Sequence, residues 1–412
     1  MTDYKALYAE KLISAEELAK QVESGWILGM DTAPSQAPAI MNAIAARVKS
    51  SDIKGVQVQT LLDAYPFEFY TDPDMFGKMT GYSWFSSGYA RKAINGGWAD
   101  LLPTYYRDIP RHIRAEYEYD AFCIEVSPMD SHGYFSLALN GSYAEAMIDK
   151  AKRVFVEVNE NQPRCLCGTQ LHVSQIDAIV EYNHELPVLP PVAIDEVSQT
   201  IGNLIAEQIP DGACIQLGIG AIPDATGMAL KSKHDLGIHT EMFTDSMVEL
   251  IECGAVNNSK KQIHRGKSVT TFAYGSKRIY DYVDDNPAIE ILPVDYVNNP
   301  EVICKNDNMI SINAAIEVDF FGQVCAESVG TKHMSGSGGQ IDFVRGACQS
   351  KGGKSFIAFT STAKGGTISK IKPILTPGAV CTTSKNDVDY IVTEYGVAHL
   401  RGRSLGERAR QL

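Results

Sequence analysis

Short runs of β-branched residues alternate along this chain with longer stretches of helical periodicity. RVFVEV and DAIVEY have the length of buried strands, whereas SYAEAMIDKAK has the apolar spacing of a helix. Alternation of this kind is typical of α/β domains whose sheets are mostly parallel. The pattern therefore predicts an α/β fold.

A proline-rich segment, NHELPVLPPVAIDEVSQ, is the best candidate for a domain boundary. Its three prolines forbid a helix and disfavour a central strand, so an extended linker is expected. We place an N-terminal α/β domain at residues 1–186, a linker at 187–194 and a C-terminal α/β domain at 195–412. A helix should begin near Asp195.

The chain repeats a pattern across this linker. Residues 13–63 and 194–245 each read as helix, glycine, short apolar strand, Gly/Pro turn, second helix and a Gly-led strand that ends in Asp. The best match aligns Gly25 with Gly212 and Gly55 with Gly237. It also sets Gln59 opposite Glu241, so that only the second copy carries a carboxylate there. Two related open α/β domains are the simplest account.

Composition narrows the class of protein. The 412 residues suffice for two or three domains, and 44% hydrophobic with 21% charged residues is ordinary for a globular chain. A disordered chain, a collagen-like chain and a small disulfide scaffold are excluded. No run approaches about 18 consecutive apolar residues, so no transmembrane helix is expected. The N-terminus lacks the basic start and apolar block of a signal peptide, and we expect a cytoplasmic protein.

Charge and cysteine usage limit the partners. The net charge of −13 argues against nucleic acid or an anionic membrane as the main partner. Nine scattered cysteines include a C-x-C at Cys165 and Cys167, which lacks the spacing of a zinc site. We expect reduced, structural cysteines, no metal and small-molecule substrates.

A glycine-rich turn in CIQLGIGAIPDATGMAL is the first candidate for chemistry. Gly218 and Gly220 would let the backbone approach a ligand closely, and the following helix N-terminus favours an anion. Pro223 occupies the position of the third glycine in a dinucleotide-binding fingerprint, which weakens that interpretation. A tight turn between strand and helix, without a ligand, remains the alternative.

The segment HDLGIHTEMFTD places Glu241 and Asp245 near the end of a predicted strand. Ligands of open α/β sheets bind outside the carboxyl ends of the strands, where a carboxylate can act as base, ligand or nucleophile. A solvated surface glutamate is the alternative. His239 is expected to be a structural neighbour rather than a metal ligand.

A second glycine cluster lies in TKHMSGSGGQIDFVRGA. Gly338 and Gly339 could present consecutive N–H groups to an oxyanion or a phosphate. Lys332 and Arg345 are possible phosphate partners. A flexible surface loop is the alternative, and the structured segment IDFVRGA that follows argues against it.

Together these segments resemble the acetyl-CoA hydrolase/transferase family, a branch of the family I CoA-transferases, and most of all its 4-hydroxybutyrate and butyryl CoA-transferases. The resemblance covers almost the whole chain and rests on these blocks: VSPMDSHGYFSLAL, VFVEVNENQPR, LHVSQIDAIVE, QLGIGAIPDA, GIHTEM, LPVDYVNNPEVI, INAAIEVDFFGQV, SGSGGQIDFVRGA and TEYGVAHLRGRSLGERAR. Two departures stand out. Ser246 replaces a usual glycine, which puts the local turn geometry in question, and the chain ends inside RGRSLGERARQL, where the family pattern usually continues.

The resemblance implies roles for particular residues. Glu241 takes the place of the catalytic glutamate and Gln216 that of the acyl-site glutamine. Asn298 takes the place of the active-site asparagine, with Asn299 as the fallback. The CoA-loop glycines fall on Gly338 and Gly339, and Gly218 with Gly220 would line the same pocket.

The resemblance also implies an activity. Acetyl-CoA and a short-chain acid, such as 4-hydroxybutyrate or butyrate, would exchange CoA through a glutamyl-CoA thioester in a site at the interface of the two domains. No tightly bound cofactor is expected; coenzyme A enters as substrate. We expect a homo-oligomer, with a dimer favoured. An acyl-CoA hydrolase is the alternative within the class, and a non-catalytic small-molecule sensor is the alternative outside it.

Overall fold

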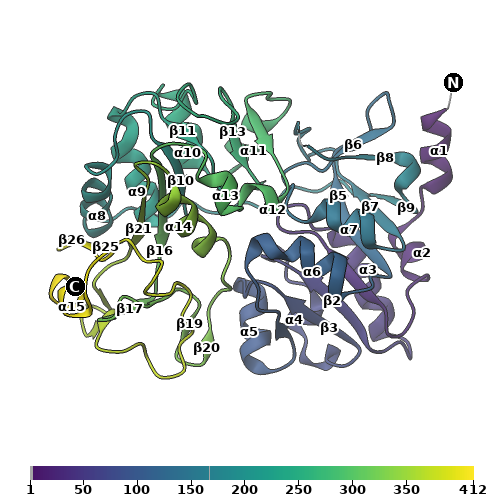
Figure 1. Cartoon of the computed structure of the whole chain (residues 1–412). Helices are drawn as coiled ribbons and strands as arrows, with labels where there is room; N and C mark the ends of the chain where they lie inside the picture. The colour runs from purple at the N-terminus through teal and green to yellow at the C-terminus, as the bar shows by residue number, and fades with distance from the viewer. Residues whose placement is uncertain (1–2, 167) are drawn as a thin grey trace. The chain divides into compact units, whose positions relative to one another are not determined.

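The structure is a computed structural model that describes residues 3–166 and 168–412 (Figure 1). The chain forms two compact units, each with its own sheet. Unit 1 contains the chain up to Thr104, Asp108–Leu189 and Thr271–Asp295. Unit 2 contains Tyr105–Arg107, Pro190–Thr270 and Tyr296–Leu412.

The change of unit after Leu189 falls inside the proline-rich segment, but the units are not continuous in sequence. Residues 271–295, which the sequence analysis assigned to the C-terminal domain, pack with unit 1. There Gly141 N donates a hydrogen bond to Thr271 O at 2.8 Å, and Leu189 N donates one to Gly275 O at 3.0 Å. The assignment of a segment to the other unit depends on packing between residues far apart in the chain, which local sequence patterns do not encode.

Unit 1 is built on a seven-stranded sheet in which every neighbouring pair is parallel. In spatial order the strands are β4 (Asp100–Leu101), β3 (Met79–Ser83), β2 (Val56–Thr60), β1 (Ile27–Met30), β5 (Ala121–Val126), β7 (Val154–Val158) and β9 (Ala178–Glu181). β5 and β7 are buried at every position, which explains their continuous apolar runs. A small antiparallel sheet pairs β6 (Tyr134–Ser136) with β8 (Gln170–His172).

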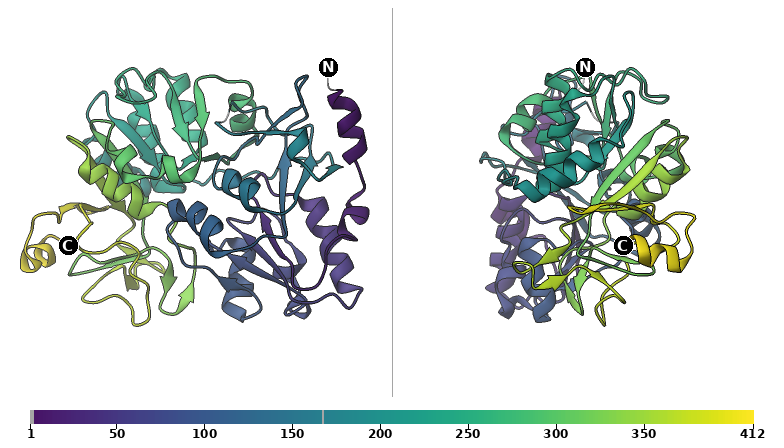
Figure 2. Two further views of the ribbon diagram at one scale, coloured as in Figure 1. Left: turned by 45° about the vertical axis from the view of Figure 1, so that its right-hand side comes forward. Right: turned by 90° about the vertical axis from the view of Figure 1, so that its left-hand side faces the viewer.

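Helices cover this sheet, and Figure 2 shows those nearest the N-terminus, in purple, alongside its strands. Apolar side chains of the second and third helices share one core cluster with the sheet. The helices of unit 1 are α1 (Tyr4–Lys11), α2 (Ala15–Ala19), α3 (Pro38–Lys49), α4 (Glu68–Thr71), α5 (Gly88–Gly96), α6 (Ile109–Glu116), α7 (Ala144–Lys150) and α11 (Lys277–Val283).

Unit 2 is built on a six-stranded sheet that is parallel except at one edge. Its order is β11 (Gly237–Ile238), β10 (Cys214–Leu217), β16 (Met309–Ala314), β21 (Lys354–Ala358), β25 (Tyr390–Thr393) and the antiparallel β26 (Gly396–His399). Its helices are α8 (Glu196–Ala206), α9 (Ala221–Ala229), α10 (Asp245–Glu252), α13 (Pro300–Ile303), α14 (Gln340–Gln349) and α15 (Leu405–Gln411). Short strands β17 (Glu317–Asp319), β18 (Val324–Cys325) and β24 (Ile371–Lys372) form a second small sheet.

The two large sheets share a strand order, as a repeat requires. β2-β1-β5-β7-β9 in unit 1 corresponds to β11-β10-β16-β21-β25 in unit 2. The α/β fold with parallel sheets is thus confirmed, and the common order supports the predicted duplication.

The register of the repeat differs from the alignment made on the sequence. Gln57 N donates to Trp26 O at 2.9 Å, and Gly237 N donates to Ala213 O at 2.9 Å. Trp26 follows Gly25 and Ala213 follows Gly212, and these two glycines are aligned. The two hydrogen bonds are therefore equivalent, and Gln57 is the structural counterpart of Gly237. The sequence alignment was therefore wrong by two positions, and Leu61 rather than Gln59 falls opposite Glu241. A slip of two residues keeps every side chain on the same face of a strand, so the pattern could not reveal it.

The helix start expected near Asp195 is confirmed. Asp195 caps α8, where its Oδ1 accepts a hydrogen bond from Ser198 N at 2.7 Å, so the helix begins where predicted. All cysteines of the described residues are free thiols; Cys123, Cys165, Cys214 and Cys325 are buried. Cys167 lies outside the described residues. Within those residues, no helix combines the length and apolar character needed to cross a membrane.

Candidate functional site

Glu241 lies just beyond the carboxyl end of β11, before the short strand β12 (Met242–Phe243). Its backbone is fixed on both sides. Thr240 N donates a hydrogen bond to Val269 O at 2.9 Å, and Thr270 Oγ1 donates one to Glu241 O at 2.8 Å. The residue therefore occupies the strand-end position that the sequence predicted for a reactive carboxylate.

Two donors of unit 2 meet the Glu241 carboxylate. Asn298 Nδ2 donates a hydrogen bond to Glu241 Oε2 at 2.7 Å, and the backbone N–H of Gly339 donates to the same carboxyl group. The structure thus brings together three residues that are far apart in the sequence. Hydrogen bonds from an amide and a backbone N–H stabilise the charged form of a carboxylate.

Burial opposes these donors and dominates. It raises the pKa of Glu241 to about 7, while Asn298 and Gly339 act to lower it. The residue as a whole keeps some exposure to solvent, although its carboxyl group is poorly hydrated. A carboxylate held this way can serve as a nucleophile near neutral pH, because it is poorly solvated.

The neighbouring asparagines have different roles. Asn298 is fully buried against Glu241, and its Oδ1 has no hydrogen-bond partner among the described residues. Asn299 instead caps α13, where its Oδ1 accepts from Glu301 N at 2.9 Å. The geometry therefore favours Asn298 over the fallback position.

His239 supports the backbone next to Asn298. Its Nε2 donates to Val297 O at 2.8 Å, and burial lowers the pKa of His239 to about 3. The ring is therefore neutral at physiological pH. This arrangement matches the structural role expected for His239.

Gly339 sits in contact with the carboxylate. A Cβ built on Gly339 would overlap both Glu241 Oε2 and Asn298 Nδ2. Gly338 is required for another reason, because its φ of +54° lies in the left-handed region. The two glycines end the loop that precedes α14, so the position predicted for a backbone donor is occupied by one.

The loop before these glycines is tied down by Glu327, a residue that the sequence analysis did not identify. Glu327 O accepts hydrogen bonds from Met334 N at 2.7 Å and Ser335 N at 3.1 Å. Its side-chain Oε1 accepts one from Ser337 Oγ at 3.2 Å. These bonds contradict the flexible-loop alternative. No spacing in the sequence marks Glu327, because its role depends on how the loop folds back.

Gln216 is buried on β10 but is not hydrogen-bonded to Glu241 among the described residues. Its Nε2 donates to Ile312 O at 3.4 Å, and its Oε1 accepts from Asn313 Nδ2 at 3.3 Å. Both partners belong to the neighbouring strand β16. The structure therefore places Gln216 in unit 2 without joining it to the Glu241 cluster.

The first glycine turn has the predicted strand–turn–helix form. Gly218 N donates to Ile312 O at 3.1 Å. Gly220 precedes α9 with a φ of +115°, and a Cβ there would meet open space. The backbone of the turn by itself requires a glycine at position 220, and a role of Gly220 in binding a ligand stays a prediction.

The two candidate phosphate partners differ. Arg345 Nε and Nη2 donate to Asp387 at 3.0 and 3.2 Å, so its guanidinium is already engaged by a carboxylate. Lys332 is exposed on β20 (Lys332–His333).

A second polar cluster lies in unit 1, where Glu125, Glu157 and His184 bring ligand-type atoms within 4.8 Å of one another. His184 Nε2 and Glu125 Oε2 form an ion pair at 2.6 Å. Glu157 accepts from Ala39 N and Ile40 N at the start of α3. Both carboxylates are therefore already engaged by contacts within the fold. Sequence spacing missed it because its members come from three separate segments.

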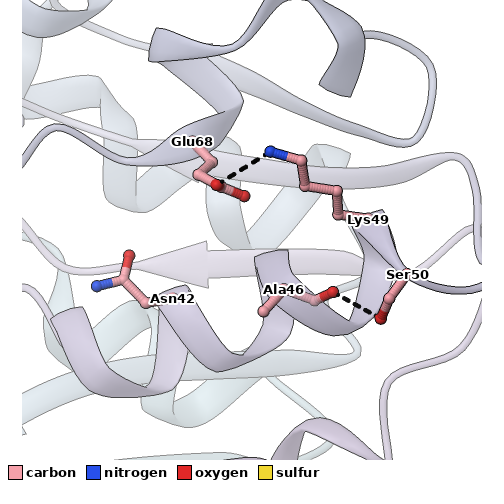
Figure 3. A pocket seen from close by; sticks show the side chains of 5 residues that line it. All are labelled: Asn42, Ala46, Lys49, Ser50 and Glu68. Atoms are coloured by element: carbon pink, nitrogen blue, oxygen red, sulfur yellow. Dashed lines mark hydrogen bonds and ion pairs between the residues drawn. The ribbon is translucent and has the colours of Figure 1, made fainter.

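A surface pocket between α3 and α4 carries none of the predicted site residues. Figure 3 shows Lys49 reaching Glu68, an ion pair of 3.2 Å, and Ser50 Oγ donating to Ala46 O at 2.8 Å. These are ordinary surface contacts.

A carboxylate, an amide and a backbone N–H thus converge at a strand end of an α/β unit, which is an arrangement that can carry nucleophilic chemistry. Profiles of the acetyl-CoA hydrolase/transferase N-terminal and C-terminal domains match residues 1–190 and 275–412. The chain belongs to the acetyl-CoA hydrolase/transferase family, as its motifs implied. Asn298 and Gly339 lie inside the second match, whereas Glu241 lies between the two.

Full-length relatives cover that intermediate segment. The chain is 46% identical to a succinyl-CoA:cyclohexane-1-carboxylate CoA transferase of Geobacter metallireducens, over 99% of this chain and 93% of the relative. It is 45% identical to a 4-hydroxybutyrate coenzyme A transferase of Clostridium kluyveri, over 100% and 95%. The crystal structure of RipA from Yersinia pestis matches with a TM-score of 0.94 and 39% identity, covering 100% of this chain and 95% of that one.

Proposed function

We propose that this chain transfers CoA between an acyl-CoA and a short-chain carboxylic acid through a glutamyl-CoA thioester on Glu241. The observation that carries the proposal is the pair of donors, Asn298 Nδ2 and Gly339 N–H, on the Glu241 carboxylate. Relatives of nearly the same length that are named CoA-transferases support it. Our placement of the site at the interface of the two domains stays a prediction; the three residues themselves belong to unit 2.

The first half-reaction forms two covalent species in turn. The ionised Glu241 carboxylate attacks the acyl-CoA carbonyl, and the C–S bond breaks to give an acyl-glutamyl anhydride and CoA thiolate. The thiolate then attacks the Glu241 carbonyl. This step forms the glutamyl-CoA thioester and releases the first acid as its carboxylate.

The second half-reaction reverses these steps with another acid. The acceptor carboxylate attacks the glutamyl thioester and expels CoA thiolate, which then attacks the acceptor's carbonyl in the new anhydride. Glu241 is regenerated and the new acyl-CoA leaves. A serine or cysteine would give an acyl-enzyme instead, which is why acid-to-acid exchange needs a carboxylate.

Each tetrahedral intermediate carries an oxyanion. The Asn298 amide and the Gly339 N–H are donors that already lie at the carboxyl group, so they are available without reorganisation. Gln216, with its hydrogen bonds to β16, would face the acyl group, as the family resemblance implies. Gly218, Gly220 and Gly338 would border the same pocket.

Trapping the thioester tests the proposal. Acyl-CoA supplied without an acceptor acid should leave CoA on Glu241, and borohydride should then reduce the thioester to an alcohol and inactivate the enzyme. Peptide mass spectrometry should locate the change at Glu241, and Glu241→Ala should abolish both labelling and transfer. A label on a cysteine such as Cys348, or transfer by Glu241→Ala, would overturn the mechanism.

The identity of the carboxylic acid that this chain prefers as substrate is a separate proposal. We propose 4-hydroxybutyrate or butyrate with acetyl-CoA; two relatives of nearly equal identity, named for different acids, show why a direct assay is needed. Acetyl-CoA and succinyl-CoA should each be tested against acetate, butyrate, 4-hydroxybutyrate and cyclohexane-1-carboxylate. CoA release without an acceptor acid would instead favour the hydrolase. Light scattering would test the expected dimer.

A further inference from the structure

The segment Tyr105–Arg107 packs with unit 2, although the chain on both sides of it belongs to unit 1. Its contacts fall on the loop that ends at Gly339 and on the first turn of α14, the helix that follows. Tyr106 N donates a hydrogen bond to Gly338 O at 3.1 Å. Arg107 Nε pairs with Asp342 Oδ1 at 3.2 Å.

The two side chains of this ion pair differ in their exposure to solvent. The Asp342 side chain is fully buried, whereas that of Arg107 is 27% exposed. Asp342 lies in the first turn of α14, where a negative charge is favoured by the helix dipole. A carboxylate removed from water needs compensating positive charge, which Arg107 supplies at 3.2 Å together with the nearby Arg345.

Restraining the first turn of α14 also restrains the position of Gly339. Gly339 caps α14, and its carbonyl accepts from Phe343 N at 3.1 Å, so the glycine moves with the start of the helix. Gly338, one residue earlier, accepts a hydrogen bond from Tyr106 N. Because the backbone of Gly339 is in direct contact with Glu241, a displacement of about 1 Å would remove its donor from the carboxylate.

We propose that Tyr105–Arg107 is a positioning segment, and Arg107 a positioning residue, which holds Gly338–Gly339 so that the Gly339 N–H stays directed at Glu241. The inference deepens the proposed function and rests on it for its catalytic consequence. Its structural part, the restraint of the loop by Arg107, stands independently.

Four variants separate positioning from simple stabilisation. Arg107→Met removes the ion pair and Arg107→Lys keeps a charge without the guanidinium. Arg401→Met is the matched control, because Arg401 Nε also pairs at 3.1 Å with a fully buried aspartate of unit 2, Asp389. If Arg107→Met does not fold, Asp342→Asn removes the same ion pair by neutralising the aspartate instead.

The first measurement is hydrogen exchange of backbone amides, followed by mass spectrometry of peptides that span 334–343. Arg107→Met should speed exchange there at least tenfold, Arg107→Lys less, and Arg401→Met less than twofold. Unchanged exchange in a folded Arg107→Met or Asp342→Asn protein, or an equal increase in the Arg401 control, would overturn the proposal.

The second measurement is the pH midpoint of Glu241 labelling by acyl-CoA and borohydride. Loss of the Gly339 donor removes a group that lowers the pKa of Glu241, so the midpoint should rise in Arg107→Met and the labelling rate should fall at least tenfold. Arg401→Met should change neither. If the wild-type chain is not labelled at Glu241 while the loop still loosens in Arg107→Met, the proposed function fails and the structural restraint holds.

Discussion

At the scale of single residues, the site depends on a carboxylate under opposing influences. Burial raises the pKa of Glu241 and two donors lower it, with a net value of about 7. The attacking form is the ionised one, so the rate of labelling should rise with pH through about 7. Substitution can remove the Asn298 donor and can fill the space beside the Gly339 donor with a methyl group, and the chain supplies a neighbouring control for each.

Asn298→Ala should lower kcat by about 10²-fold, the usual cost of one oxyanion donor. It should also shift the rising limb of the pH–rate profile to higher pH, because the hydrogen bond that the substitution removes favours the charged carboxylate. Asn299→Ala loses only the cap of α13 and should cost about 1 kcal/mol of stability while turnover is kept. Steady-state kinetics across pH and thermal melts of both variants check this, and equal kinetic effects would contradict it.

The two loop glycines should respond differently to the same substitution. Gly339→Ala should abolish transfer, because its methyl group would overlap Glu241 and Asn298. Gly338→Ala should cost about 1–2 kcal/mol from its left-handed backbone and retain measurable activity. Turnover with a circular dichroism spectrum for each folded variant is the measurement. Near-normal turnover in Gly339→Ala would show that the loop is not at the reacting carboxyl.

At the scale of elements, α9 and α10 approach closely at a residue that departs from the family pattern. Ser246 is buried in the first turn of α10 with regular helical backbone, so the serine causes no distortion of the turn. Its Oγ lies 3.0 Å from Thr244 Oγ1 and also hydrogen-bonds Asp224. Gly227 of α9 faces it, where a Cβ would come within 3.0 Å of Ser246 Cβ.

Ser246→Gly should therefore destabilise the chain by about 1 kcal/mol, from lost helix propensity and a lost hydrogen bond, and leave kcat within twofold. Gly227→Ala, with its closer contact, should destabilise it more. Urea unfolding of both variants together with initial rates tests the pair. A Ser246→Gly protein that is more stable than the wild type would show that the serine strains this contact.

At the scale of the whole molecule, buried carboxyl groups make stability depend on pH. Burial raises the pKa of Asp31 to about 7, of Asp63 to about 6 and of Glu157 to about 8. Each group binds its proton more tightly in the folded chain than in the unfolded one. Their contribution to stability is therefore complete below about pH 4 and is lost as pH rises to about 8.

Asp31→Asn should flatten this dependence, by up to about 1.4 kcal/mol per pH unit between pH 4 and 7. The remaining amide oxygen can still accept from Thr32 N, a bond of 2.9 Å in the wild type. Urea unfolding of wild type and variant at pH 5, 6.5 and 8 is the measurement. Identical slopes in the two proteins would mean that Asp31 does not titrate in this range.

The sequence by itself determined the α/β class, many of the elements and the family of this protein. Strand runs such as RVFVEV, the start of α8 at Asp195 and the paired glycine turns are local features, because hydrophobic period and capping act within a few residues. Ordered motifs indicated the family and pointed to Glu241, Asn298 and Gly339. A residue's identity and its neighbours suffice for such inferences.

Only the tertiary structure decided which of these residues meet. It placed Asn298 and not Asn299 against Glu241, gave Gln216 hydrogen-bond partners on β16, and packed residues 271–295 with unit 1. It also revealed Glu327 and Arg107, whose importance comes from a loop folding back and from a buried charge that needs a partner. Such contacts join segments far apart in the chain, and their geometry is set by packing that no local pattern records.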